Sequence, residues 1–274
     1  MAAQATAWCT RHRVTRTVNK ARQMQQVKQN GRRISSKCGG LFCCRLVSTR
    51  IVRHSSSELC YKHEMTLSVQ EQFGQIDIYV FDQILRGNIA GGMRVVDAGC
   101  GYGRNLVYLL REGFEVFAVD ADAAAINHVR RLSASFSTGL PAENFQVGSI
   151  EEMPFASDSA DVVICSAVLH FARNEEHFRA MLAQLWRVVR PGGMLFCRLG
   201  SRIGMDFERV RDGIFLVGDG SEWFLVDEKM LLELTHEMDA VLVDPLKTTI
   251  VQDLRCMTTW VLRKRHTHTT TTTT

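Results

Sequence analysis

The stretch of sequence that decides the fold is VVDAGCGYGRN, residues 95–105. It reads as a short buried strand that ends in an acidic residue, followed by a glycine-rich turn and the start of a helix. A second apolar run, residues 115–119, leads to Asp120, 23 residues after Asp97. A glycine-rich turn after one strand and a carboxylate after the next are the layout of a nucleotide-type cofactor site in an open α/β sheet.

Details of this turn separate one cofactor class from another. A dinucleotide-binding turn has the pattern G-x-G-x-x-G, and here Arg104 stands where the third glycine belongs. Asp97, two residues before the first glycine, would repel a pyrophosphate but suits an ammonium group. The missing β-carbons at Gly99, Gly101 and Gly103 let the backbone turn tightly and approach a ligand. The turn therefore argues against a nicotinamide dinucleotide.

Strand and helix patterns alternate outward from this turn. Such alternation predicts a Rossmann-like, doubly wound, mostly parallel seven-stranded sheet with an antiparallel final strand. Residues 200–225 show no such pattern, and we expect an irregular insertion that covers the acceptor. The expected helices are 70–86, 104–111, 123–135, 175–189 and 226–238, and the expected strands are 94–98, 115–119, 145–147, 161–166, 194–199, 240–243 and 257–262.

Composition divides the chain into three parts: a basic leader (1–64), an α/β domain (65–265) and a low-complexity threonine tail (266–274). The net charge is +4, but the leader carries 13 Lys and Arg against two acidic residues, which leaves −7 for the rest. The leader resembles an organellar transit peptide; the alternatives are that it is not part of the functional protein or that it binds nucleic acid. We therefore expect a cytoplasmic protein, or a mitochondrial or plastid one if the leader is a transit peptide.

The acidic body makes nucleic acid an improbable main partner, because phosphate contacts need clustered Lys and Arg. Its four cysteines (Cys100, Cys165, Cys197 and Cys256) lie in or beside apolar runs and are expected to be buried thiols of a reducing compartment. No Cys/His spacing indicates a metal site, and no run of 18 apolar residues indicates a membrane span.

Three further segments strengthen the interpretation of the turn. The chain resembles class I S-adenosylmethionine-dependent methyltransferases in DAGCGYG (97–103), in EEMPF with the following SDSADVV (151–163), in SAVLHF (166–171) and in LWRVVRPGG (185–193). The resemblance covers about residues 65–264, and residues 101–109 are similar to the tellurite-resistance branch of that family.

This resemblance implies S-adenosylmethionine as the cofactor. Asp97, Gly99 and Gly101 would surround its methionine moiety, Asp120 would accept the ribose hydroxyls, and Ala121 would back the adenine. The other turn residues expected at the site are Cys100, Gly103 and Asn105, although Arg104 and Asn105 have the alternative of capping the helix or pairing with surface acids.

Three residues after the third strand correspond to the adenine edge. Ser149 stands where the family usually has Asp, so its hydrogen bond would be neutral and weaker, and Glu151 offers a substitute. The resemblance implies that Ile150 contributes its backbone amide. It also implies that Ser166, at the end of the fourth strand, faces the amino group of the cofactor.

The candidates for the acceptor side lie beyond the later strands. His170 is the candidate general base, with a structural histidine as its alternative. Tyr79 would either cover the cofactor or pack inward, and Arg198 would either bind an anionic acceptor or form an exposed salt bridge. Trp223 belongs to the expected lid.

The sequence thus predicts a methyltransferase acting on a small-molecule acceptor, with no metal and no membrane association, as a monomer or homodimer. A non-catalytic S-adenosylmethionine-binding module and an NAD(P)-dependent oxidoreductase remain as alternatives.

Overall fold

The computed structural model describes residues 67–266. The predicted leader and all but the first residue of the predicted tail lie outside these residues. The described elements, in chain order, are α2 (Val69–Phe73), α3 (Ile78–Leu85), β1 (Arg94–Ala98), α4 (Val107–Arg111), β2 (Glu115–Asp120), α5 (Ala123–Ser135), the 3₁₀ helix η2 (Ala142–Asn144), β3 (Phe145–Val147), η3 (Ile150–Glu152), β4 (Ala160–Ser166), η4 (Leu169–Phe171), α6 (Glu175–Val188), β5 (Val189–Gly200), β6 (Glu208–Arg211), β7 (Ile214–Leu216), β8 (Glu222–Phe224), α7 (Glu228–Glu237), β9 (Ala240–Leu242), β10 (Lys247–Val251) and β11 (Arg255–Lys264).

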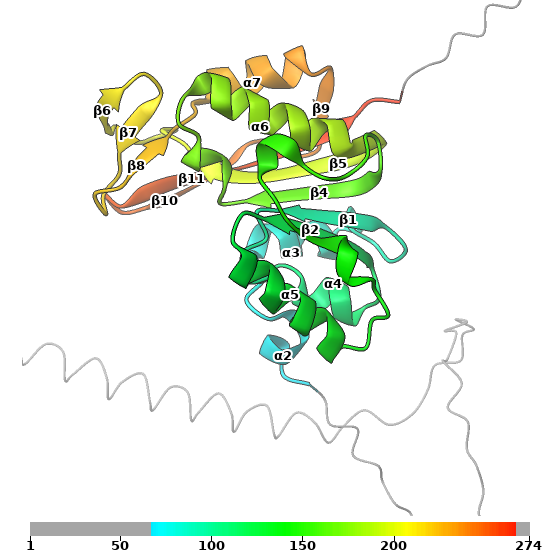
Figure 1. The fold of residues 1–274 in the computed structure, drawn as a ribbon. Coiled ribbons are helices and arrows are strands. Elements are labelled where there is room, and N and C mark those ends of the chain that lie inside the picture. Colours follow the sequence, from blue (N-terminus) through cyan, green and yellow to red (C-terminus); the bar gives the residue numbers. More distant parts are fainter. Residues whose placement is uncertain (1–66, 267–274) are drawn as a thin grey trace, which may run out of the picture. The chain divides into compact units, whose positions relative to one another are not determined.

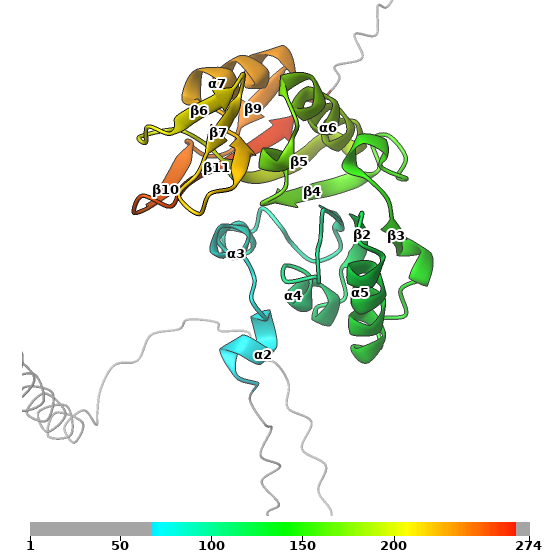
Figure 2. The same cartoon turned by 60° about the vertical axis from the view of Figure 1, so that its left-hand side comes forward.

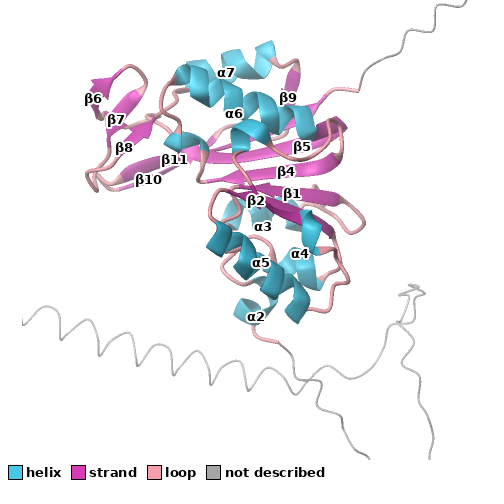
Figure 3. Ribbon diagram, viewed as in Figure 1, coloured by secondary structure: helices cyan, strands magenta, loops and turns pink. Residues whose placement is uncertain are grey.

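One large sheet organises the described part of the chain, with the strand order β10-β11-β5-β4-β1-β2-β3 and with β9 paired to β11 (Figures 1 and 3). Strands β1 to β5 are parallel to one another, whereas β11 runs antiparallel to β5, β9 and β10. This confirms the predicted parallel sheet with an antiparallel final strand. The order in which successive strands are added to the sheet reverses between β1 and β4. Ligands bind at such a switch point in open α/β sheets, beyond the carboxyl ends of the strands.

Helices cover both faces of the sheet (Figure 1). One apolar cluster, which includes Phe178, Leu185 and Trp260, forms on the face of α6 and α7. The other, which includes Leu109 and Phe196, forms on the face of α3, α4 and α5. Because parallel strands are buried on both faces, β1, β4 and β5 are almost continuously apolar in sequence.

The predicted strand count of seven is one short, because the edge of the sheet next to β11 is divided in two. Strand β9 pairs with Leu262–Lys264 of β11 and β10 pairs with Arg255–Thr259. Pro245 lies between them, and a proline cannot donate the backbone hydrogen bond that an unbroken strand would need. Strand β10 was not predicted.

The predicted helix 70–86 is wrong in one respect, since it is broken into α2 and α3. Gly74 ends α2 with φ of +63°, and Asp77 caps α3 by accepting a hydrogen bond from the amide of Tyr79. The helix predicted over 104–111 is observed only as α4, because residues 101–106 form successive turns before it. Both differences matter below, since they determine where Asp77 and Arg104 lie.

The insertion predicted to be irregular is a small antiparallel sheet, β6-β7-β8 (Figures 1 and 2). Asp212-Gly213 forms the two-residue connection of its first hairpin, a strong hairpin signal that the prediction overlooked. Its second loop is tied to the β10–β11 turn by the amide of Gly218, which donates to the carbonyl of Leu254 over 2.8 Å.

Candidate functional site

Asp97 lies buried near the carboxyl end of β1, with 1% of its surface exposed. Its Oδ2 atom has no hydrogen-bond partner among the described residues. Burial raises the pKa of this carboxyl to about 7, although the nearby charge of Arg104 opposes the change. A buried carboxylate without a partner is costly, so this position fits a ligand that brings a cationic hydrogen-bond donor.

The glycines of the turn after β1 serve two different purposes. Gly99, Gly101 and Gly103 have φ of 73°, 51° and 78°, which L side chains rarely adopt. A β-carbon on Gly99 would lie 2.5 Å from Val168 Cγ2, and one on Gly103 would lie 3.1 Å from Val129 Cγ2. A β-carbon on Gly101 would meet no atom within 4 Å. Packing therefore requires a glycine at Gly99 and leaves little room at Gly103, whereas Gly101 presents bare backbone to open space.

Asp120 ends β2 beside this turn. Its carboxylate accepts from the amide of Gly101 over 2.7 Å and from the amide of Asp122 over 2.9 Å. The buried Cys100 lies in the same turn, and its amide donates to the carbonyl of Val119. The turn after β1 and the carboxylate at the end of β2 are thus joined by a hydrogen bond.

The loop after β3 carries the other residues predicted on the adenine side. Ser149 and Ala121 are exposed, whereas Ile150 is buried. Glu151 is bound to the ring of His177, the third residue of α6. A hydrogen bond from its own backbone amide, together with that from His177, holds the pKa of Glu151 below its usual value. Glu151 is therefore already engaged, which weighs against its replacing the missing Asp.

A buried carboxylate that the sequence did not single out joins the two halves of the site. Asp77 Oδ2 accepts from Arg198 Nη1 over 3.1 Å, from Ser166 Oγ over 3.2 Å and from Arg104 Nη2 over 3.4 Å, while Oδ1 accepts from the amide of Tyr79. Arg104 also donates to Ser166 Oγ over 2.9 Å. Two guanidinium groups share one carboxylate, so the group formed by Asp77, Arg104 and Arg198 carries one excess positive charge.

The amide of Asp77 donates to Asn105 Oδ1 over 3.0 Å, so α3 is fastened to the glycine-rich turn. The alternative of Asn105 as a helix cap is therefore wrong, and α4 begins without a side-chain cap. An Asp three residues after a glycine was the available signal for this capped helix start. The assumption of one unbroken helix over 70–86 concealed it.

The other end of α3 is held as firmly. The carboxylate of Asp244, in the connection between β9 and β10, accepts from Arg86 and from Gln83. Burial acts to raise the pKa of Asp244, but these donors and Lys247 outweigh it, so the pKa lies below its usual value. Helix α3 is thus fixed across the face of the sheet at both ends.

Tyr79 and Arg198 form one wall at the carboxyl end of β5. The guanidinium of Arg198 lies 5.3 Å from the centre of the Tyr79 ring, and the Tyr79 hydroxyl is 2.6 Å from Thr249 Oγ1 on β10. Arg198 pairs in register with Thr259 of β11, and both Arg198 Nε and Thr259 Oγ1 are buried without a partner among residues 67–266. The alternative of an exposed salt bridge for Arg198 is wrong, because its partner Asp77 is buried.

His170 and Trp223 form a second contact group, just beyond the carboxyl end of β4. The two rings are stacked with centroids 4.1 Å apart, and Phe171 is exposed beside them. His170 Nδ1 accepts from the amide of Gly200 over 3.3 Å, and burial lowers the pKa of His170 to about 4. A neutral ring that accepts through Nδ1 carries its proton on Nε2. The small sheet thus places Trp223 against His170, just beyond the end of β4.

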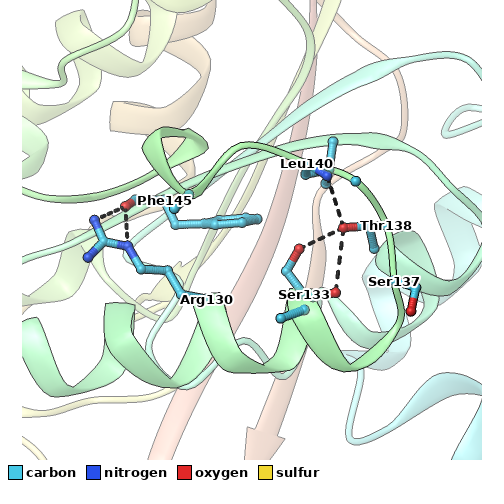
Figure 4. A pocket seen from close by; sticks show the side chains of 9 residues that line it. Arg130, Ser133, Ser137, Thr138, Leu140 and Phe145 are labelled. Atoms are coloured by element: carbon cyan, nitrogen blue, oxygen red, sulfur yellow. Dashed lines mark hydrogen bonds between the residues drawn. The ribbon is translucent and has the colours of Figure 1, made fainter.

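Two hollows lie away from this constellation. One of about 440 Å³ is formed by the last turns of α5 and the loop that follows, where Ser133, Thr138 and Phe145 line it (Figure 4). The other, of about 240 Å³, is lined by Arg94, Phe117 and further residues. Both include residues from the starts of strands, whereas Asp97, Asp120 and Ser166 lie at strand ends, so neither hollow belongs to the candidate site.

Within residues 67–266, no group of three or more His, Cys, Asp or Glu side chains is arranged to hold a metal ion. Within the same residues, no helix has the length and apolar character needed to cross a bilayer. The four described cysteines are buried free thiols, and burial raises the pKa of Cys100 far above its usual value.

Comparison with known proteins relates this chain to methyltransferases. Residues 96–197 match the model of the family described as "Methyltransferase domain". An uncharacterized methyltransferase, YodH of Bacillus subtilis, is 32% identical over 101 residues, which are 37% of this chain and 40% of that protein. A phthiotriol/phenolphthiotriol dimycocerosates methyltransferase of Mycobacterium ulcerans is 30% identical over 134 residues, 48% of this chain and 46% of that protein. The chain thus covers less than half the length of either relative.

Among solved structures, a SAM-dependent methyltransferase from Methanosarcina mazei superposes with a TM-score of 0.51 at 18% identity, over 67% of this chain and 97% of that one. A likeness at this identity concerns the fold. Residues 96–197 therefore match a methyltransferase domain, and the described sheet has the fold of a SAM-dependent methyltransferase of known structure.

Proposed function

We propose that the protein binds S-adenosylmethionine and transfers its methyl group to a small-molecule acceptor. The observation that carries this proposal is the pair of carboxylates at neighbouring strand ends, buried and unpartnered in Asp97 and half-exposed in Asp120, on either side of the bare backbone of Gly101. A cationic amino group suits the first carboxylate and a ribose diol suits the second.

In this proposal the turn residues hold the methionine and ribose parts of the cofactor. Asp97, Gly99 and Gly101 surround the amino-acid end, with Cys100, Gly103 and Asn105 shaping the turn. Asp120 accepts the ribose hydroxyls in exchange for, or in addition to, the Gly101 amide. Ala121, Ser149, Ile150 and Glu151 border the adenine, with Glu151 positioning the loop through His177, and Ser166 faces the amino group.

Methyl transfer from a sulfonium is a displacement in which the cofactor itself supplies the reactive methyl and the leaving group. The chain therefore needs mainly to align donor and acceptor and to exclude water. Helix α3, fixed by Asp77 and Asp244, and the small sheet, which carries Trp223, form the two sides that would exclude water.

The acceptor would lie between Tyr79 and Arg198 on one side and Trp223 with His170 on the other. The tautomer of His170 suits a hydrogen-bond donor through Nε2, and its low pKa makes it a weak base. The ring's one lone pair, at Nδ1, already accepts from the Gly200 amide, so a base role requires the other tautomer, in which Nε2 carries no proton. The Mycobacterium ulcerans relative is named for phthiotriol and phenolphthiotriol dimycocerosates, which supports a small-molecule acceptor.

The proposal includes a monomer or homodimer without a nucleic-acid partner, in the cytoplasm or, with a functional leader, in an organelle. Size-exclusion chromatography with light scattering and imaging of a fluorescent fusion with and without residues 1–64 test these points.

Calorimetry with S-adenosylhomocysteine and with NADH tests the cofactor. We expect binding of S-adenosylhomocysteine only, because Arg104 and Asp97 disfavour a pyrophosphate; binding of NADH alone would refute the proposal. Transfer of a radiolabelled methyl group to a metabolite extract then separates an enzyme from a non-catalytic binding module, and no labelled product would favour the module.

A further inference from the structure

We propose that Arg104 binds the carboxylate of the cofactor's amino-acid end, so that Arg104 and Asp97 together recognise a zwitterion. This inference rests on the proposed function, because it concerns the same site. It assigns a role to an arginine that occupies the place of a dinucleotide-binding glycine.

The first step in the argument is the incomplete partner set of Asp97. Its Oδ2 is buried and has no hydrogen-bond partner among the described residues, and no ion pair joins it to Arg104, whose nearest carboxylate is that of Asp77. The charge of Arg104 nevertheless acts on Asp97, since it opposes the rise in the pKa of that carboxyl. Arg104 thus lies close enough to act on Asp97 without forming an ion pair with it, so a ligand that carries both charges could pair with each of them.

The second step is the position of the guanidinium. Arg104 donates to Ser166 Oγ over 2.9 Å, and its side chain is 44% exposed although Asp77 is buried. Ser166 ends β4, two residues beyond Ile164, which pairs in register with Asp97 of β1. The guanidinium has five N–H donors, and its two bonds through Nη2 leave others for a planar carboxylate.

The third step is the balance of charge. Asp77 is shared by Arg104 and Arg198, so one carboxylate serves two cations. Arg198 is turned inward beneath Tyr79 and is 20% exposed, which leaves Arg104 as the more accessible of the pair. A carboxylate at Arg104 would restore neutrality, just as an ammonium would at Asp97.

The test compares S-adenosylmethionine with one ligand that lacks only this carboxylate and with another that lacks the amino-acid end. Decarboxylated S-adenosylmethionine keeps the ammonium and the sulfonium, whereas 5′-methylthioadenosine lacks the whole amino-acid end. Calorimetry with both and with S-adenosylmethionine is done on the full chain and on the variants Arg104→Gln and Arg131→Gln, the latter an exposed arginine of α5 that serves as the matched control.

We expect Arg104→Gln to weaken S-adenosylmethionine binding by about 10- to 100-fold, the usual effect of losing a hydrogen bond to a charged group. Binding of the decarboxylated ligand and of methylthioadenosine should change less than about threefold, which is under 0.7 kcal/mol. Arg131→Gln should change none of them. An equal loss for S-adenosylmethionine and for its decarboxylated form would overturn the inference, because it would show that Arg104 acts only by supporting the site.

A second variant separates direct contact from support. Arg198→Gln removes the other cation from Asp77, and any effect transmitted through Asp77 should weaken both ligands alike. A carboxylate-specific loss in Arg198→Gln rather than in Arg104→Gln would also overturn the inference. Failure of the unaltered chain to bind any of the three ligands would instead refute the proposed function, and with it the inference.

Discussion

Two of the three glycines in the turn after β1 provide the sharpest test of how the site is built. Gly99 and Gly101 both have positive φ, but their surroundings differ. A methyl group on Gly99 would lie 2.5 Å from Cγ2 and 3.1 Å from Cγ1 of Val168, whereas one on Gly101 would face open space. We therefore expect Gly99→Ala to damage stability and Gly101→Ala to damage cofactor binding.

The magnitudes follow from two separate costs. An alanine in the left-handed region costs about 1–2 kcal/mol, and this applies to both variants. Overpacking adds about 1–3 kcal/mol at Gly99 alone, because the branched side chain of Val168 has little freedom to move. Gly99→Ala should thus lower the free energy of unfolding by about 2–5 kcal/mol and Gly101→Ala by about 1–2 kcal/mol.

Urea unfolding measures the first quantity and calorimetry with S-adenosylhomocysteine measures the second. Gly101→Ala should lose about tenfold or more in affinity, about 1.4 kcal/mol. Gly139→Ala is the matched control, since Gly139 has φ of +70° with no atom within 4 Å of its β-carbon and lies outside the site. Equal stability of Gly99→Ala and Gly101→Ala would refute the role given to Val168, and equal affinity of Gly101→Ala and Gly139→Ala would refute the role given to the open backbone.

Three further outcomes are expected. Asp120→Ala should weaken S-adenosylhomocysteine binding by about 1–3 kcal/mol through the lost charge-assisted bonds, and an unchanged dissociation constant in calorimetry would refute the ribose assignment. Because burial raises the pKa of Asp97 to about 7, the folded state holds its proton more tightly than the unfolded state, so the contribution of this carboxyl to stability without ligand should fall as the pH rises from about 4 to about 7. Urea unfolding of Asp97→Asn over this range should lack that fall, and an identical pH dependence would contradict the assignment. Burial lowers the pKa of His170 to about 4, so the contribution of this ring to stability should rise between pH 4 and about 6.5, opposite in sign to that of Asp97. NMR should show a ring that stays neutral down to pH 5, and a ring that titrates near pH 6.5 would contradict its burial.

Local patterns were sufficient for most of the fold. Helix α5 and strand β3 have the predicted bounds, and Asp227 caps α7 as its place before an apolar period indicates. These features depend on periodicity and capping within about 15 residues, which is information that the chain carries locally. The glycine-rich turn and the acidic strand ends belong to the same class.

The predicted helix 70–86 and the predicted irregular insertion were wrong because a break signal and a hairpin signal in the sequence were not used. The apolar spacing over 70–86 continues through the break at Gly74, so periodicity alone joins α2 to α3. The short strands of the small sheet are too brief for a periodic pattern, although Asp212-Gly213 marks their hairpin.

The sequence by itself determined the alternating strands and helices, the turn of residues 99–103 and the two carboxylates that flank it, because each is encoded by neighbours in the chain. Only the tertiary structure decided which polar groups meet: Asp77 contacts Arg198 across 121 positions, and Glu151 is bound to His177 on another element. Charges so far apart have no spacing rule, and their pairing follows from the order of the strands in the sheet. That order brings the ends of β1, β4 and β5 together beneath α3 and makes a site of residues that the sequence presents singly.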